Sequence, residues 1–247
     1  MSNNINKTSV QKIVASYNRM EEAKLAIEAL NPTSNPIPTI SSIVDTLDSI
    51  DSIVKRPLAN YIEDSVVAKW ASSQFGIGPV LSAGLLSHID IVKAHTPGAV
   101  WRYAGLDPSS SNKKIFNGDL KSICWKIGSN FAKHAAKPNC FYGKLYLQDK
   151  ERRIKKNNEG LYADKAKDIL SDLPYKFRSD VSLLKQGKLS DEQIDAQARR
   201  FAVKIFLSHY YAIAYQEQHG TTAVRPSHIT INGEKQYIEI PNNPFDK

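Results

Sequence analysis

The sequence predicts a mainly α-helical fold: a helical bundle that contains a helix–hairpin–helix module, coiled-coil-like helices near its N-terminus and a small β-hairpin at its C-terminus. Three observations predict it. Apolar residues recur at helical spacing through most of the 247 residues. A Gly-x-Gly-Pro segment at residues 76–79 joins two such stretches. Only the segment after residue 220 alternates as strands do, around an Asn-Gly pair that favours a two-residue hairpin turn.

We expect four segments in chain order. Residues 1–38 form an N-terminal helix, over about Thr8–Leu30, and a proline-rich linker. Residues 39–74 form a coiled-coil-like helix. Residues 75–220 form the main helical domain, and residues 221–247 form the hairpin tail.

The coiled-coil prediction rests on one apolar stripe. Ile43, Leu47, Ile50 and Val54 follow at four-three-four spacing, the seam of a short coiled coil. Two heptads fit an amphipathic core helix equally well. Pro57 is expected to kink or restart this helix.

The Gly-x-Gly-Pro segment predicts a tight turn between two helices. Gly76 and Gly78 can take positive φ and bring backbone N–H groups close to a ligand, while Pro79 suits the first turn of the next helix. The N–H groups and dipole of that helix suit a phosphate oxygen. The alternative is a close helix–helix corner without a ligand.

A helix is expected over Val80–Ile89, followed by a break at Pro97-Gly98 and a closing segment, Trp101–Pro108. The stretch from residue 75 to 108 resembles the C-terminal transposase domain of the Piv-invertase and IS-one-ten (IS-one-sixteen) insertion-sequence recombinases. In that family a G-I-G-P hairpin precedes an alanine/leucine helix and a Y-A-G-L-x-P segment. Asn117 and Lys121 match positions of the family's G-N-x-x-L-R helix start. The resemblance covers about residues 40–133, with a weaker echo over residues 199–215.

Helices are also predicted downstream. One begins at Asn117 or Gly118, and its inward residues are Leu120, Ile123, Cys124, Ile127 and Phe131. The next runs over Phe141–Asn157, where Tyr142 and Tyr146 are either core aromatics or base-stacking residues.

One short helix is expected in the polar stretch 159–189. After it, Ser190 and Gln193 form a capping box for a long helix that reaches about Gln218 and is ended by Gly220.

The charge and the hydrophobic pattern of the sequence indicate which kinds of partner the protein could bind. The net charge is +8 and the pI is about 9.3, and residues 109–170 hold fourteen Lys/Arg against six Asp/Glu. This excess favours a polyanionic partner, although a solvated charge run is the alternative. No apolar run approaches the ~18 residues that cross a bilayer, and the N-terminus lacks a signal-peptide pattern. We expect a cytoplasmic, nucleoid-associated protein with no membrane partner, in which Cys124 and Cys140 are free thiols.

The resemblance implies a transposase-related DNA-binding protein whose 75–220 domain binds duplex or branched DNA, with structured RNA as a further partner. The resemblance also implies that the protein is a homodimer. Compact relatives of this recombinase family are labelled transposases in bacterial and phage genomes. The residues expected to contact the backbone are Gly76, Ile77, Gly78, Pro79, Lys121, Lys126, Arg152, Arg153, Arg200 and Lys204. Binding of this kind needs no cofactor.

An enzyme is the second hypothesis: a DNA transposase or recombinase acting with a partner subunit or a guide RNA. The family's four metal-binding acidic residues lie in an N-terminal RuvC-like domain, for which we find no room here. Divalent metal would therefore enter only if a partner supplies that site. The family's serine nucleophile, which commonly precedes a glycine, would correspond to Ser110 or Ser111, but this interval contains no Ser-Gly pair. A third hypothesis is a protein-interaction module in which the hairpin is a relic.

Overall fold

The computed structural model describes residues 5–32, 36–107, 116–172, 181–223, 229–231 and 234–246. Within these ranges the chain forms ten helices and one pair of short strands, so the mainly α-helical prediction is confirmed. The helices are α1 Lys7–Glu28, α2 Pro38–Ile62, α3 Val66–Ser73, α4 Pro79–His88, α5 Pro97–Tyr103, α6 Gly118–Lys133, α7 Phe141–Asn158, α8 Ala163–Asp172, α9 Val181–Lys185 and α10 Asp191–His219. None of the described helices combines the length and apolar character that crossing a bilayer requires.

The chain divides into two compact units. Unit 1 comprises residues 1–124 and 207–247, and unit 2 comprises residues 125–206. The boundaries fall inside α6 and α10, so each of these helices contributes to both units. This division differs from the four consecutive segments expected from the sequence, because the second part of α10 belongs with the N-terminal helices.

Helix α4 is the centre of unit 1. Most of its residues are buried, and α1, α2 and α3 all pack against it. A Cβ atom on Gly84 would lie 2.7 Å from Cδ1 of Ile123 and 3.4 Å from Cγ1 of Val14, so the glycine lets α1 and α6 approach closely. The Ser82 hydroxyl donates to the Ala68 carbonyl at 2.6 Å and thereby ties α4 to α3.

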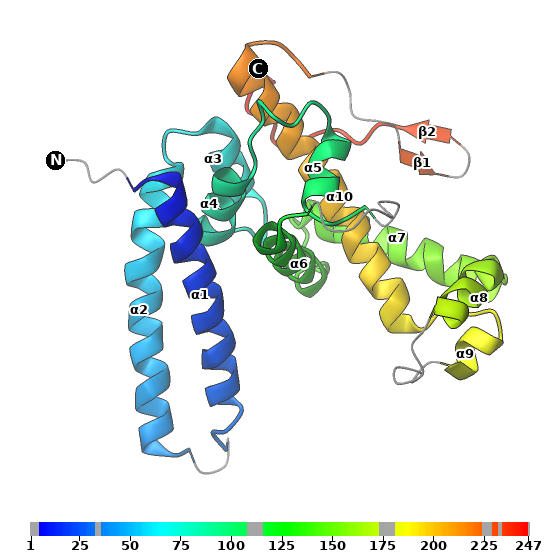
Figure 1. Ribbon diagram of the computed structural model, residues 1–247, viewed down its shortest axis with the longest axis horizontal. Helices are drawn as coiled ribbons and strands as arrows, with labels where there is room; N and C mark the ends of the chain where they lie inside the picture. The colour runs from blue at the N-terminus through cyan, green and yellow to red at the C-terminus, as the bar shows by residue number, and fades with distance from the viewer. Residues whose placement is uncertain are drawn as a thin grey trace. The chain divides into compact units, whose positions relative to one another are not determined.

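Helices α1 and α2 lie side by side (Figure 1). Polar bonds connect them: the Tyr17 hydroxyl donates to Asp51 at 2.6 Å, and Lys24 binds Asp48. The face of α2 turned to α1 therefore contains these two aspartates.

That orientation places only part of the predicted seam inward. Leu47 and Val54 are half-buried, but Ile43 is 43% exposed and Ile50 is 38% exposed. The helix also continues through Pro57, so the restart that the sequence allowed there does not occur.

Two local predictions were wrong. Pro97 is the first residue of α5 rather than a break; the Thr96 hydroxyl caps the helix by accepting from the Ala99 N–H at 3.2 Å. The stretch 159–189 contains two helices, α8 and α9, where one was expected.

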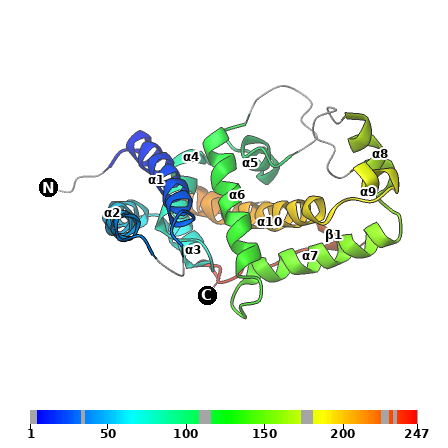
Figure 2. The ribbon, with the colours of Figure 1, turned by 90° about the horizontal axis from the view of Figure 1, so that it is seen from below.

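Unit 2 is built around α7 and the first part of α10, with α8 and α9 beside the C-terminal end of α7 and the N-terminal end of α10 (Figure 2). Phe131, Tyr142 and Phe206 form its aromatic core, with ring centroids 5.0 to 5.8 Å apart. Tyr142 and Tyr146 are buried, as core aromatics are. Cys140 is a buried free thiol, as is Cys124 in unit 1.

The capping box that starts α10 is confirmed. The Ser190 N–H donates to Gln193 Oε1, and the Gln193 N–H donates to the Ser190 hydroxyl. At the other end, Gly220 takes a φ of 69°, the left-handed conformation that ends many helices.

The C-terminal segment of unit 1 contains strands β1 (Ile229–Ile231) and β2 (Glu234–Gln236), paired antiparallel with Thr230 opposite Lys235. The Asn-Gly pair of the predicted turn lies outside the described residues, so the hairpin stays a prediction. The second strand ends at Gln236, although the alternating pattern continues to Ile240.

The residues after β2 are bound to the helices of unit 1. The Trp70 indole N–H donates to the Pro241 carbonyl at 2.8 Å, and His209 Nε2 lies 2.9 Å from the Ile238 carbonyl. These two bonds anchor the C-terminal segment.

Candidate nucleic-acid interface

The first part of the predicted interface is the turn between α3 and α4. Gly76 has a φ of 87°, in the left-handed region that favours glycine. Ile77 is buried, and its N–H donates to the Gln74 carbonyl at 3.0 Å. Gly78 has a φ of −97° and an extended backbone, which any residue adopts. The expectation that both glycines would take positive φ therefore holds for Gly76 alone.

The N-terminus of α4 lacks a side-chain cap. Gly78 is the N-cap residue, and Pro79, at the first helical position, has no N–H to donate. A Cβ atom on Gly78 would meet no atom within 4 Å. The positive end of the α4 dipole therefore adjoins open space at Gly78, an arrangement that accommodates an anion.

Asn117 and Lys121, at the start of α6, have different roles in the structure. Asn117 caps the helix by accepting from the Leu120 N–H at 2.8 Å, and its amide donates to the Tyr103 hydroxyl at 3.0 Å. Lys121 is exposed, and its ammonium nitrogen lies 4.7 Å from the centroid of the Phe116 ring. Asn117 thus has a structural role, whereas Lys121 presents its charge to solvent.

Arg152 and Arg153 on α7 share one buried partner. Both guanidinium groups bind the carboxylate of Asp149, whose side chain is 1% exposed. The Arg152 guanidinium carbon also lies 5.7 Å from the centroid of the Phe201 ring. The two arginines therefore stabilise unit 2 and keep only part of their surface, 26% and 19% respectively, toward solvent.

A second polar network lies between α7 and α10. Asp195 accepts from Lys150 at 2.7 Å and from the Tyr146 hydroxyl, and Arg199 pairs with its other oxygen at 2.5 Å. Burial opposes ionisation of this carboxyl, but the hydrogen bonds from Lys150 and Tyr146 outweigh it and lower the pKa of Asp195. The Tyr146 side chain is buried and its hydroxyl is held in this network, the environment of a core aromatic.

The remaining predicted cations lie on α6 and α10. Arg200 is exposed, and Lys126 and Lys204 are half-buried. The predicted residues are divided between the units, with residues 76–79 and Lys121 in unit 1 and the others in unit 2.

Sequence reasoning missed four side chains of unit 2. Asp149 and Asp195 organise the arginines and lysines around them, and Gln197 and Lys165 join α10 to α8. The order Asp149-x-x-Arg152-Arg153 carries a signal that could have been used, because acidic and basic residues three and four positions apart face each other on a helix. The Asp195–Arg199 pair follows the same rule, but nothing local predicts the contacts of Asp195 with Lys150 and Tyr146 or of Lys165 with Gln197, which join different helices.

The two predicted serines, Ser110 and Ser111, lie outside the described residues. Among the residues that are described, no group of three or more His, Cys, Asp or Glu side chains could hold a metal ion.

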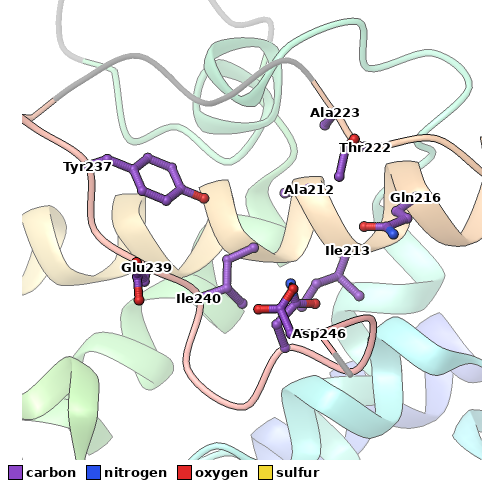
Figure 3. A pocket seen from close by; sticks show the side chains of 10 residues that line it. Ala212, Ile213, Gln216, Thr222, Ala223, Tyr237, Glu239, Ile240 and Asp246 are labelled. Atoms are coloured by element: carbon purple, nitrogen blue, oxygen red, sulfur yellow. The ribbon is translucent and has the colours of Figure 1, made fainter.

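A pocket of about 410 Å³ lies in unit 1 between α10 and residues 237–246 (Figure 3). Tyr237, Glu239 and Asp246 line it, and the Asp246 carboxylate accepts from the Asn243 amide at 2.9 Å. Because its wall carries two carboxylates, the pocket does not suit a phosphate.

No protein-family model, curated protein or solved structure matches this chain. The function is therefore argued from the residues and their geometry.

Proposed function

We propose that this protein binds the phosphate backbone of nucleic acid, as a transposase-related DNA-binding protein. One observation carries the proposal. Residues 125–206, which form unit 2, contain 18 Lys/Arg and 10 Asp/Glu, so this unit holds the whole net charge of +8, and the rest of the chain is neutral. A basic unit of this kind attracts a polyanion and gains affinity by releasing counterions.

The turn between α3 and α4 supports the same function from unit 1. Its positive-φ glycine and the uncapped N-terminus of α4 are the parts that a helix–hairpin–helix uses to hold a phosphate oxygen. Contacts of this type are independent of base sequence. We therefore expect little discrimination between sequences and a preference set by the shape of the nucleic acid.

The test is a salt titration of binding to labelled duplex DNA, branched DNA and structured RNA. The logarithm of affinity should fall linearly with the logarithm of salt concentration, by about 0.9 for each duplex phosphate neutralised. An affinity that does not change with salt would refute the proposal.

The contribution of the turn is tested at Gly78. Since a side chain there meets no neighbour within 4 Å, Gly78→Glu leaves the fold intact and places a carboxylate at the uncapped helix end. We expect it to weaken binding by about tenfold, through loss of one charge-assisted contact and added repulsion. The matched control is Gly78→Gln, which has the same size without the charge. Equal affinities for the two variants would exclude the turn from the interface.

A second candidate function, protein interaction, is favoured by the outer face of α2. Ile43, Ile50 and Ile53 lie on one stripe of this helix, and Ile53 is 70% exposed. Thr46 lies on the same stripe, which is uncharged from Ile43 to Ile53. We propose that this stripe forms a homodimer through a short coiled coil. Ile50→Lys should then convert the dimer to a monomer in light scattering; an unchanged mass would exclude this contact.

A further inference from the structure

Two cations from different helices of unit 2 converge on one neutral oxygen. The Gln197 Oε1 atom on α10 accepts from Arg153 Nη1 on α7 at 2.8 Å and from Lys165 Nζ on α8 at 2.9 Å. The two nitrogens therefore lie no farther apart than the sum of these distances. An amide oxygen carries only a partial negative charge, so it leaves the repulsion between the two cations largely uncompensated.

The local charge balance is positive. Arg153 is paired through its Nε with Asp149, but no described residue forms an ion pair with Lys165. The positive charge of Arg200, on α10, also repels the charge of Lys165. Burial, followed by the charges of Arg153 and Arg200, lowers the pKa of Lys165. Of these cations, only Arg153 pairs with a carboxylate among the described residues, and it shares that carboxylate, Asp149, with Arg152.

The backbone holds these side chains in place. Ala166, next to Lys165, is fully buried in a cluster with Leu184, Leu189 and Ile194, which joins α8 and α9 to the start of α10. Gln197 follows Ile194 by one helical turn. The backbone positions from which Lys165 and Gln197 extend are therefore fixed by the packing of α8, α9 and α10.

We infer that Arg153 and Lys165 form a preformed subsite for one oxyanion, a phosphate of the nucleic-acid backbone. The oxyanion would supply the full negative charge that the Gln197 amide lacks, and the guanidinium and ammonium groups are strong donors to phosphate oxygens. The identity of the ligand as nucleic acid rests on the proposed function, whereas the preference for a phosphate rests on the convergence of Arg153 and Lys165 on one neutral oxygen.

The decisive variant is Gln197→Glu. It replaces the neutral acceptor by a carboxylate of the same shape, which would pair with Lys165 and Arg153 internally. We expect its melting temperature to rise by about 2–4 °C, as a stabilisation near 1 kcal/mol produces in a chain of this size, while its affinity for labelled duplex DNA falls by about tenfold. A structural polar contact without a ligand would raise the melting temperature and leave DNA binding unchanged.

The matched pair is Lys165→Gln and Lys167→Gln. Both remove one positive charge from α8, but only Lys165 contacts Gln197. We expect Lys165→Gln to weaken DNA binding by about tenfold and to reduce the salt slope by about 1, and Lys167→Gln to change affinity by less than about twofold. Equal effects of the two substitutions would overturn the subsite.

Inorganic phosphate separates this inference from the proposed function. Thermal stability of the wild type should rise with phosphate, relative to chloride at equal ionic strength, and the Gln197→Glu variant should show no such rise. DNA binding that all variants retain would leave the proposed function standing and overturn the subsite. Phosphate stabilisation without binding to any nucleic acid would confirm an oxyanion site and refute the proposed function. If neither phosphate nor nucleic acid binds, both are refuted.

Discussion

His209 should make the stability of unit 1 depend on pH. The side chain is 2% exposed, and its Nε2 donates to the Ile238 carbonyl, since a carbonyl can only accept. Burial, partly offset by this bond, lowers the pKa of His209 from 6.5 to about 4. The unfolded chain therefore takes up a proton at a higher pH than the folded chain, and stability falls as the pH drops from above 6.5 toward 4.

The expected size follows from these two pKa values. At 1.36 kcal/mol for each unit, the free energy of unfolding should fall by about 2 kcal/mol between pH 7.5 and pH 5 through His209 alone. The measurement is urea unfolding across this pH range for the wild type and for His209→Gln. The glutamine keeps an N–H donor for Ile238 but does not titrate, and every other group is common to both proteins.

The difference between the two pH curves isolates His209. The curve of His209→Gln should be flatter than that of the wild type by about 2 kcal/mol over this range. Parallel curves would show that the imidazole is hydrated in the folded state, and would refute the assignment of a buried, neutral His209 that anchors the C-terminal segment.

Two substitutions test the packing of unit 2. Gly143→Ala should lower the free energy of unfolding by about 3 kcal/mol in chemical denaturation, because its Cβ would lie 2.7 Å from the Ala135 Cα and 2.8 Å from the Phe131 carbonyl oxygen, neither of which can move independently; a loss below about 1 kcal/mol would show that α6 and α7 separate easily. Asp149→Asn should cost about 3 kcal/mol in the same experiment, since it removes the buried charge that Arg152 and Arg153 share. A stability equal to that of the wild type would mean that solvent replaces the carboxylate.

Local patterns were sufficient for much of the fold. The five inward residues predicted for α6 are all buried, and the Ser190–Gln193 capping box is formed as predicted, because periodicity and capping depend on residues within one helix. The apolar stripe predicted on α2 shows a limit of such local patterns, because only part of it is buried. That helix carries apolar residues on two faces, and the face that turns inward is the one that packs on α1 and α4, where Asp48 and Asp51 bond to α1.

The candidate interface was predictable in composition but not in detail. The sequence locates the excess of positive charge and the glycine turn, yet it predicts neither that Gly78 is extended nor that Asp149 engages Arg152 and Arg153. The convergence of Arg153 and Lys165 on Gln197 joins residues from three helices. Contacts between side chains of different helices depend on tertiary packing, which the helical periodicity of a sequence does not specify.

The division of unit 1 between both ends of the chain has a consequence for its synthesis. Unit 2 is encoded as one continuous stretch, so its helices emerge from the ribosome together and can pack while the chain is still growing. Unit 1 is completed later: α1 to α5 are made first, but Pro241, whose carbonyl accepts from Trp70 on α3, is translated near the end of the chain, as are His209 and Ile238, which bond to each other. The early helices therefore lack the C-terminal partner of Trp70 throughout translation of unit 2, a period in which incompletely packed helices expose apolar surface.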